Sequence, residues 1–214
     1  EIIKEKAISI CVGKKGIGTQ EVTVQILGDS FVNGAFFRDA LLSKNYIPGI
    51  KLVGLRNIKN EEGQYDEGRG GWTVKKYFEI PKGEMTSYHG YMQPVGEYRY
   101  WGSCEFWKNC YKVINGELTD TEIVYNCGRY DQCITKFDKE TGYLAAPKKN
   151  DLMYDNARGS YMVYTGKKWK NVEVDERKWA FNYRKYLDMW NLDAPKFFAQ
   201  MLGLNDYRDS LTAD

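Results

Sequence analysis

Histidine is nearly absent from this sequence, which contains a single one, His89, among 214 residues. Long hydrophobic runs are also missing, since no stretch reaches the roughly 18 apolar residues that a membrane-spanning helix needs. The sequence has no excess of charge of one sign, because 31 basic and 29 acidic side chains leave a formal net charge of +2. These absences predict no membrane span and give no electrostatic reason to expect nucleic acid as a partner.

Cysteine is scarce and unevenly placed. The five cysteines are Cys11, Cys104, Cys110, Cys127 and Cys133. The last four form two C-x5-C pairs, whereas zinc sites usually show tighter spacing, so we expect no metal site. Two interpretations stay open: one or two disulfides, which fit a secreted or periplasmic protein, or unpaired buried thiols. The chain starts at Glu1 without a signal peptide, so we expect a mature or trimmed chain whose natural N-terminus lies upstream.

Strand and helix patterns alternate near both ends of the chain. Short apolar, β-branched runs predict strands, and apolar residues recurring every three or four positions predict helices. The predicted strands cover residues 21–27, 50–55 and 196–202, and the predicted helices cover 31–44, 72–79 and 179–190. This alternation predicts an α/β domain with a parallel sheet, formed by residues 21–80 and 179–214. Right-handed crossovers place all strand C-termini at one edge, where functional residues gather.

Residues 81–178 differ in character, being rich in Tyr, Trp, Gly and Cys, and they predict a β-rich insertion. Strands are expected over residues 98–101, 112–114 and 122–125, with Asn115-Gly116 as a hairpin turn. Residues 1–20 predict an N-terminal strand over 6–12 and a linker. That strand belongs either to a preceding β domain or to the edge of this one.

A serine stands where the first predicted strand ends and a helix begins, in Gly28-Asp29-Ser30. A serine hydroxyl there faces the ligand-binding edge, and its backbone N–H belongs to the unsatisfied helix N-terminus. That N–H can stabilise the oxyanion that forms when the Ser30 hydroxyl attacks a carbonyl. The alternative is that Ser30 only caps the helix.

Two further elements end strands at the same predicted edge. Gly71, in Gly70-Gly71-Trp72, offers a backbone N–H to a closely approaching ligand, unless this is only a glycine turn. Asn205, in Gly203-Leu204-Asn205-Asp206, offers an amide donor, unless it only forms an Asx turn. Together the three strand ends supply one nucleophile and two donors, which is the arrangement that acyl transfer requires.

These three blocks resemble the signature blocks of the SGNH/GDSL hydrolases, over residues 21–80 and 179–209. The resemblance implies a flavodoxin-like three-layer α/β/α fold, with Ser30 as the nucleophile. It implies an oxyanion hole formed by the N–H groups of Ser30 and Gly71 and the side chain of Asn205. Asp29 and Asp206 would be supporting residues that fix turns, and no cofactor or metal is implied.

The sequence departs from this family at the fourth block, Asp-x-x-His, which carries the catalytic base and the group that orients it. No Asp-x-x-His occurs, and His89 lies in the insertion, where a surface or packing role is expected. We therefore expect a fragment whose C-terminal segment, carrying the base, is missing or bound as a separate chain. Alone, it should hydrolyse esters very poorly, because a serine without a base is a weak nucleophile.

Two functions follow as hypotheses. The first is an esterase that removes acetyl or other small acyl groups from a carbohydrate or another small molecule, with Trp101, Trp107 and Trp169 stacking on sugar rings. The alternative for these aromatic residues is that they fill the core of the insertion. The second function is a non-catalytic carbohydrate-binding protein on a degenerate hydrolase fold. A reading frame that continues into Asp-x-x-His would favour the esterase, and a stop codon after Asp214 would favour the binding protein.

Overall fold

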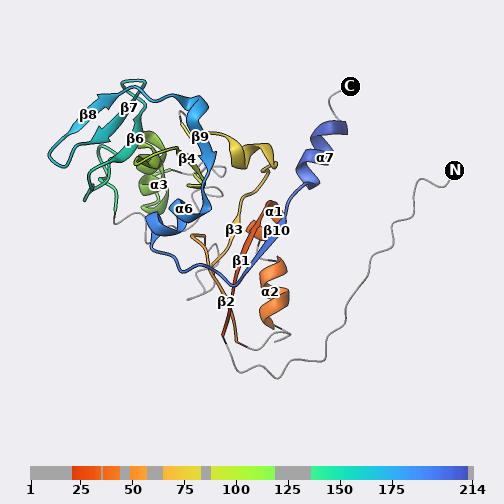
Figure 1. Ribbon diagram of the computed structural model, residues 1–214. Helices are drawn as coiled ribbons and strands as arrows, with labels where there is room; N and C mark the ends of the chain where they lie inside the picture. Colours follow the sequence, from red (N-terminus) through yellow and green to blue (C-terminus); the bar gives the residue numbers. More distant parts are fainter. Residues whose placement is uncertain are drawn as a thin grey trace.

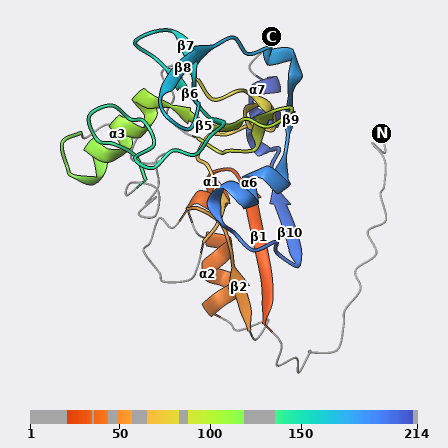
Figure 2. The ribbon, with the colours of Figure 1, turned by 60° about the vertical axis from the view of Figure 1, so that its left-hand side comes forward.

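The computed structural model describes residues 21–34, 36–43, 49–56, 65–82, 88–118 and 136–211. It has two adjoining parts, a small parallel sheet with its helices and a β-rich part (Figure 1). In both ribbon views the β-rich part lies toward the carboxyl ends of the parallel strands (Figure 2). The expected α/β character is confirmed, since helices alternate with parallel strands in the sheet and the β-rich part contains mixed pairing.

The parallel sheet is centred on β1 (Val22–Gly28). Strand β10 (Phe197–Met201) pairs along one side of β1, and β2 (Ile50–Leu52) pairs with the first half of its other side. A two-residue strand, β3 (Glu67–Gly68), then continues along the second half of β1. All three pairings are parallel, as the sequence predicts, but β3 was not expected and the second strand is shorter than predicted.

The first predicted helix is two helices, α1 (Ser30–Asn33) and α2 (Phe36–Ser43). Gly34 ends α1, and its N–H donates to the Ser30 carbonyl at 2.8 Å. These helices cover one face of the sheet, where Ile26, Val32 and Leu52 form a small buried cluster. The helix predicted over 72–79 is only a 3₁₀ turn, η1 (Lys75–Phe78), and α7 (Leu204–Leu211) follows β10.

The insertion is β-rich, as predicted. Strand β5 (Arg99–Ser103) pairs in parallel with β6 (Asp151–Asp155), which continues antiparallel through β7 (Ser160–Tyr164) and β8 (Trp169–Val172). A separate antiparallel pair joins β4 (Met92–Pro94) to β9 (Trp179–Phe181). The strand expected over 98–101 is therefore confirmed as β5.

Helix α3 (Cys104–Ile114) corrects two expectations, a strand over 112–114 and a hairpin at Asn115-Gly116. Ser103 caps α3 by accepting a hydrogen bond from the Phe106 N–H, and the helix buries the face that carries Phe106, Trp107 and Cys110. Asn115-Gly116 ends this helix, with a φ of 76° at Gly116, instead of joining two strands. The strands expected over 6–12 and 122–125 lie outside the described residues.

Helix α6 (Tyr183–Trp190) begins four residues later than predicted. The preceding residues form β9 after a short 3₁₀ turn, η2 (Glu176–Lys178), because they pair with β4. The side chain of Asn182 caps α6 by accepting from the Lys185 N–H at 2.9 Å. Helix α6 and the insertion share one aromatic core, in which Tyr186, Leu187 and Trp190 are buried.

The cysteines show both predicted states. Cys110 is disulfide-bonded to a partner outside the described residues, whereas Cys104 is a free, buried thiol. Burial, with the nearby carboxylate of Asp155, raises the pKa of Cys104 to about 12, so the thiol stays protonated. Cys11, Cys127 and Cys133 lie outside the described residues.

Candidate active site

The three strand ends named by the sequence meet at one edge of the parallel sheet. Gly28, the last residue of β1, is in register with Gly68 of β3 on one side and Met201 of β10 on the other. Ser30 follows this row by two residues, Gly71 by three and Asn205 by four. The structure thus places the three predicted site residues beyond the same edge, with Ser30 at the start of α1, Gly71 in the loop after β3 and Asn205 in the first turn of α7.

Ser30 is the first residue of α1 and is exposed to solvent. The residue that caps α1 is Asp29, whose Oδ1 accepts from the Phe31 N–H at 3.1 Å. The alternative role of Ser30 as the cap is therefore wrong, because Asp29 caps α1. Within the described residues, neither the Ser30 hydroxyl nor its N–H has a hydrogen-bond partner, which leaves both groups available to a ligand.

Gly71 has a left-handed backbone, with a φ of 70°, and it is exposed. A Cβ atom built at this position meets no atom within 4 Å, so open space lies beside the peptide. Its loop is tied to β1, since the Arg69 N–H donates to the Gly28 carbonyl at 2.8 Å. The Gly71 N–H also has no hydrogen-bond partner among the described residues.

Asn205 and Asp206 connect the loop after β10 to the loop that contains Gly71. The buried Asn205 side chain donates from Nδ2 to the Trp72 carbonyl at 2.9 Å. Both carboxylate oxygens of Asp206 accept from the Val74 N–H, at 3.1 and 3.0 Å. Both side chains thus bond a neighbouring loop and not their own turn, and the second amide hydrogen of Asn205 is left for another acceptor.

A buried ion pair between Glu67 and Arg69 supports the loop that carries Gly71, and the sequence did not predict it. The Glu67 carboxylate accepts from Arg69 Nη2 at 2.9 Å and from the Leu55 N–H at 2.7 Å, and it is bonded to the Tyr186 hydroxyl. The Tyr77 hydroxyl donates to the carbonyls of Gly28 and Glu67, at 2.8 and 3.0 Å. The only available sequence signal is that two charged residues, Glu67 and Arg69, flank Gly68, and this signal alone predicts no buried ion pair.

Asp66 adds a titratable group to this support. Its Oδ1 accepts from the Gly68 N–H at 2.9 Å, and Oδ2 lies 3.8 Å from Arg38 Nη1. Burial raises the pKa of Asp66 to about 6, although the hydrogen bond from Gly68 and the charge of Arg56 oppose the shift. The carboxyl therefore changes charge near neutral pH, two residues from the loop that carries Gly71.

His89 is a packing residue and is only 1% exposed. Its Nδ1 accepts from the Tyr91 N–H at 3.0 Å, and Nε2 lies 3.2 Å from the Glu79 carbonyl. Burial and the charge of Arg69 lower the pKa of His89 to about 3, so the ring is neutral. With both nitrogens engaged in this way, His89 is not placed to act as a base for Ser30.

An apolar pocket of about 380 Å³ is lined by residues of β1, η1, β9, α6 and β10. Leu27 of β1 and Leu202, just after β10, line its end nearest to the site. Phe181, Tyr183 and Phe198 line the remainder. The pocket therefore begins within a few residues of Ser30 and Asn205.

The tryptophans of the insertion belong mainly to its core. Trp101 and Trp107 are only 7% and 2% exposed, and Trp107 stacks on Phe137 with ring centroids 3.9 Å apart. Trp169 is half-buried and packs against Tyr143. This arrangement agrees with the core-filling alternative, although Trp101 also lines a separate pocket within the insertion.

Other kinds of site receive no support from the part of the chain that the structure describes. Those ranges contain no group of three or more His, Cys, Asp or Glu side chains able to hold a metal ion. None of the helices described is long and apolar enough to cross a membrane. No protein-family model, curated protein or solved structure matches this chain.

Proposed function

We propose that this chain carries the acyl-transfer site of a serine ester hydrolase of the SGNH/GDSL type, within a flavodoxin-like three-layer sheet. One observation supports this proposal most strongly. A serine hydroxyl and a glycine N–H, both without a hydrogen-bond partner among the described residues, and an asparagine amide follow three register-matched parallel strands at one edge. The cross-loop hydrogen bond from Asn205 to the Trp72 carbonyl keeps two of these three loops together.

In the proposed reaction, the Ser30 oxygen attacks the ester carbonyl carbon while its proton passes to a base. The resulting oxyanion accepts hydrogen bonds from the N–H groups of Ser30 and Gly71 and from the Asn205 amide. Collapse of this intermediate expels the alcohol, which takes the proton from the base, and leaves an acyl group on Ser30. Water, deprotonated by the same base, then releases the acid and regenerates the serine.

We propose that a histidine base comes from outside these 214 residues, because the one histidine present, His89, is buried and engaged elsewhere. A C-terminal segment, continuous with the chain or bound as a separate one, would supply it. Among the described strands β10 pairs only with β1, and its other side, next to the site, is where a further parallel strand would pair. A secreted or periplasmic location is part of the same proposal, and the disulfide at Cys110 supports it.

The proposed substrate is an ester of a small acyl group, with a carbohydrate as the alcohol. The apolar pocket that begins at Leu27 and Leu202 offers space for the acyl side. The insertion, which lies toward the carboxyl ends of the strands, would contact the alcohol side (Figure 2). Acetylated xylan or pectin and a nitrophenyl ester are suitable first substrates.

The decisive experiment supplies the missing base from solution. Hydrolysis of nitrophenyl acetate by the 214-residue chain should be slow and should rise with added imidazole, beyond the rate that imidazole produces without protein. Ser30→Ala should abolish this increase, whereas the matched control Ser160→Ala, in β7, should leave it unchanged. The serine mechanism is wrong if Ser30→Ala hydrolyses the ester as fast as the wild type in two settings. The first is the 214-residue chain with imidazole, and the second is the protein expressed from the uncut reading frame.

The second candidate is a carbohydrate-binding protein that does not catalyse. The engagement of His89 in packing favours it, because the sequence then offers no imidazole to Ser30. This candidate predicts that saccharides bind while no Ser30-dependent hydrolysis occurs, even in the protein from the uncut reading frame. The two functions are therefore separated by measuring binding and turnover on the same preparation.

A further inference from the structure

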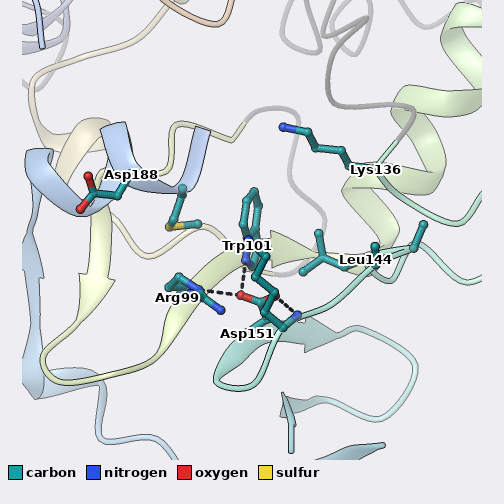
Figure 3. A pocket seen from close by; sticks show the side chains of 10 residues that line it. Arg99, Trp101, Lys136, Leu144, Asp151 and Asp188 are labelled. Carbon is teal, nitrogen blue, oxygen red and sulfur yellow. Dashed lines mark hydrogen bonds and ion pairs between the residues drawn. The ribbon is translucent and has the colours of Figure 1, made fainter. Parts of the chain in front are cut away.

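A second pocket, of about 290 Å³, lies in the insertion between β5, β6 and α6 (Figure 3). None of its lining residues belongs to the candidate active site. In Figure 3 the Trp101 ring stands between Lys136 on one side and Arg99 and Asp151 on the other. The volume is at the lower end of the range for small-molecule sites, which suits a ligand with a single ring.

The apolar part of this pocket is a fixed surface. Trp101, Leu144 and Met189 line it, and each is less than a tenth exposed. Trp101 is held in place because its Nε1–H donates to Asp151 Oδ1 at 2.9 Å. A ring-shaped ligand would therefore meet a surface that needs little rearrangement on binding.

The two acidic side chains of the pocket are already engaged. Asp151 accepts from Arg99 Nε at 2.8 Å and from the Lys148 N–H at 2.6 Å, in addition to Trp101. Asp188 pairs with Arg184 along α6 at 3.4 Å. Their negative charges are thus largely balanced by groups that do not belong to a ligand.

Two lysines at the pocket have no such partner. Within the described residues, neither Lys136 nor Lys148 forms an ion pair, although both line the pocket. The Lys136 ammonium lies 5.5 Å from the centroid of the Trp190 ring, which holds it close to the pocket without neutralising its charge. The pocket therefore combines an apolar surface with an excess of positive charge at its margin.

We propose that this pocket binds a ring-bearing carboxylate, with the carboxylate attracted by the lysines at the pocket margin, Lys136 and Lys148, and the ring on Trp101 and Met189. Two kinds of ligand carry both a ring and a carboxylate: an acidic sugar, such as a uronic acid in a polysaccharide, and an aromatic acid. This site stands apart from Ser30 and does not depend on the proposed hydrolysis. It would give the insertion a function of its own, in recognising an acidic ligand.

Binding is tested by titrating the folded chain with glucuronate and with benzoate, against the neutral counterparts glucose and benzyl alcohol. At low salt each carboxylate that binds should do so at least about tenfold more tightly than its neutral counterpart. The acid that binds more tightly identifies the kind of ligand. Equal binding of charged and neutral ligands, or binding of none of the four, contradicts the proposal.

The place in the fold where the ligand binds is tested with the signals of labelled methionine methyl groups. The Met189 signal, assigned with the conservative variant Met189→Leu, should move on titration, and the signal of Met92, a core residue that does not line the pocket, should stay fixed. A shift at Met92 without one at Met189 would place the ligand elsewhere and overturn the assignment.

The contribution of the lysine charges to carboxylate binding is tested with lysine variants. Lys136→Ala and Lys148→Ala should each weaken carboxylate binding by about two- to fivefold, as expected for partly exposed charges. The matched control Lys168→Ala, in the exposed β7–β8 turn, should not change it, and Ser30→Ala should leave it intact. A double charge reversal at Lys136 and Lys148 that keeps the wild-type affinity for the carboxylate would refute the proposed role of these lysines. The melting temperature of each variant is measured to show that the variant is folded.

Discussion

Gly68→Ala should separate the loops of the candidate site, because no space exists for a side chain where α1 crosses β3. A Cβ atom at Gly68 would lie 2.1 Å from the Asn33 nitrogen and 2.6 Å from the Val32 carbonyl carbon, both of which are backbone atoms. Relief requires α1, which carries Ser30, to move away from the strand that leads to Gly71. Overpacking of this kind costs about 1–3 kcal/mol, and we expect the upper end because no flexible side chain can give way.

Urea unfolding of Gly68→Ala and wild type measures this cost, with the slope of the transition checked for two-state behaviour. A loss of about 3 kcal/mol would lower the melting temperature by about 6–12 °C in a chain of this size. The control is Gly159→Ala in the β6–β7 turn, where a Cβ atom meets nothing within 4 Å but the φ of 63° still disfavours alanine. If Gly68→Ala proves no less stable than Gly159→Ala, the close approach of α1 to β3 is not real.

Three further predictions concern the groups around the site. Arg69→Met should cost about 3–5 kcal/mol in urea unfolding, because it leaves the Glu67 carboxylate buried without its cation, and a second change, Glu67→Gln, should restore part of the loss. The pKa of Asp66 is higher in the folded state, so the folded state binds this proton more tightly than the unfolded state does. The stabilisation from this proton is present below the unfolded pKa of 3.8 and is lost as the pH rises through the folded pKa of about 6. Relative to Asp66→Asn, the wild type should therefore lose on the order of 3 kcal/mol of unfolding free energy across this window, and parallel pH profiles would contradict the shift. Asn205→Ala and Asp206→Ala should both destabilise the chain by about 1–3 kcal/mol, but only Asn205→Ala should lower Ser30-dependent hydrolysis by a further 10²–10³-fold.

The strands of the parallel sheet could be predicted because their signals are local. An apolar, β-branched run that stops at Gly28 is typical of a buried strand, and the run over 196–202, which is apolar but has no β-branched residue, gives a weaker strand signal for β10. Their shared direction followed from the alternation with helices. The same reasoning placed Ser30, Gly71 and Asn205 at one edge, where the structure has them.

The failures came where tertiary partners decide the conformation. Residues 112–114 have the β-branched character of a strand, but they belong to α3 because Ser103 caps that helix and its aromatic face packs into the core. Residues 179–181 follow a helical spacing yet pair with β4. Strand β3 has only two residues, and no periodicity can be read from so short a segment.

The buried charges at Glu67 and Arg69 show why the site is more constrained than its short motifs indicate. Without supporting contacts, the short loop that carries Gly71 would be free to sample many conformations, because glycine residues accept a wide range of backbone angles. Here the loop starts from a buried ion pair that is bonded to α6, and it ends at Trp72 and Val74, whose backbone groups bond Asn205 and Asp206. Because both ends are bonded to side chains from other elements, the loop that carries Gly71 is restrained before any ligand arrives. Preorganised donors are what oxyanion stabilisation requires, so these supporting contacts favour an acyl-transfer site over a glycine turn without function.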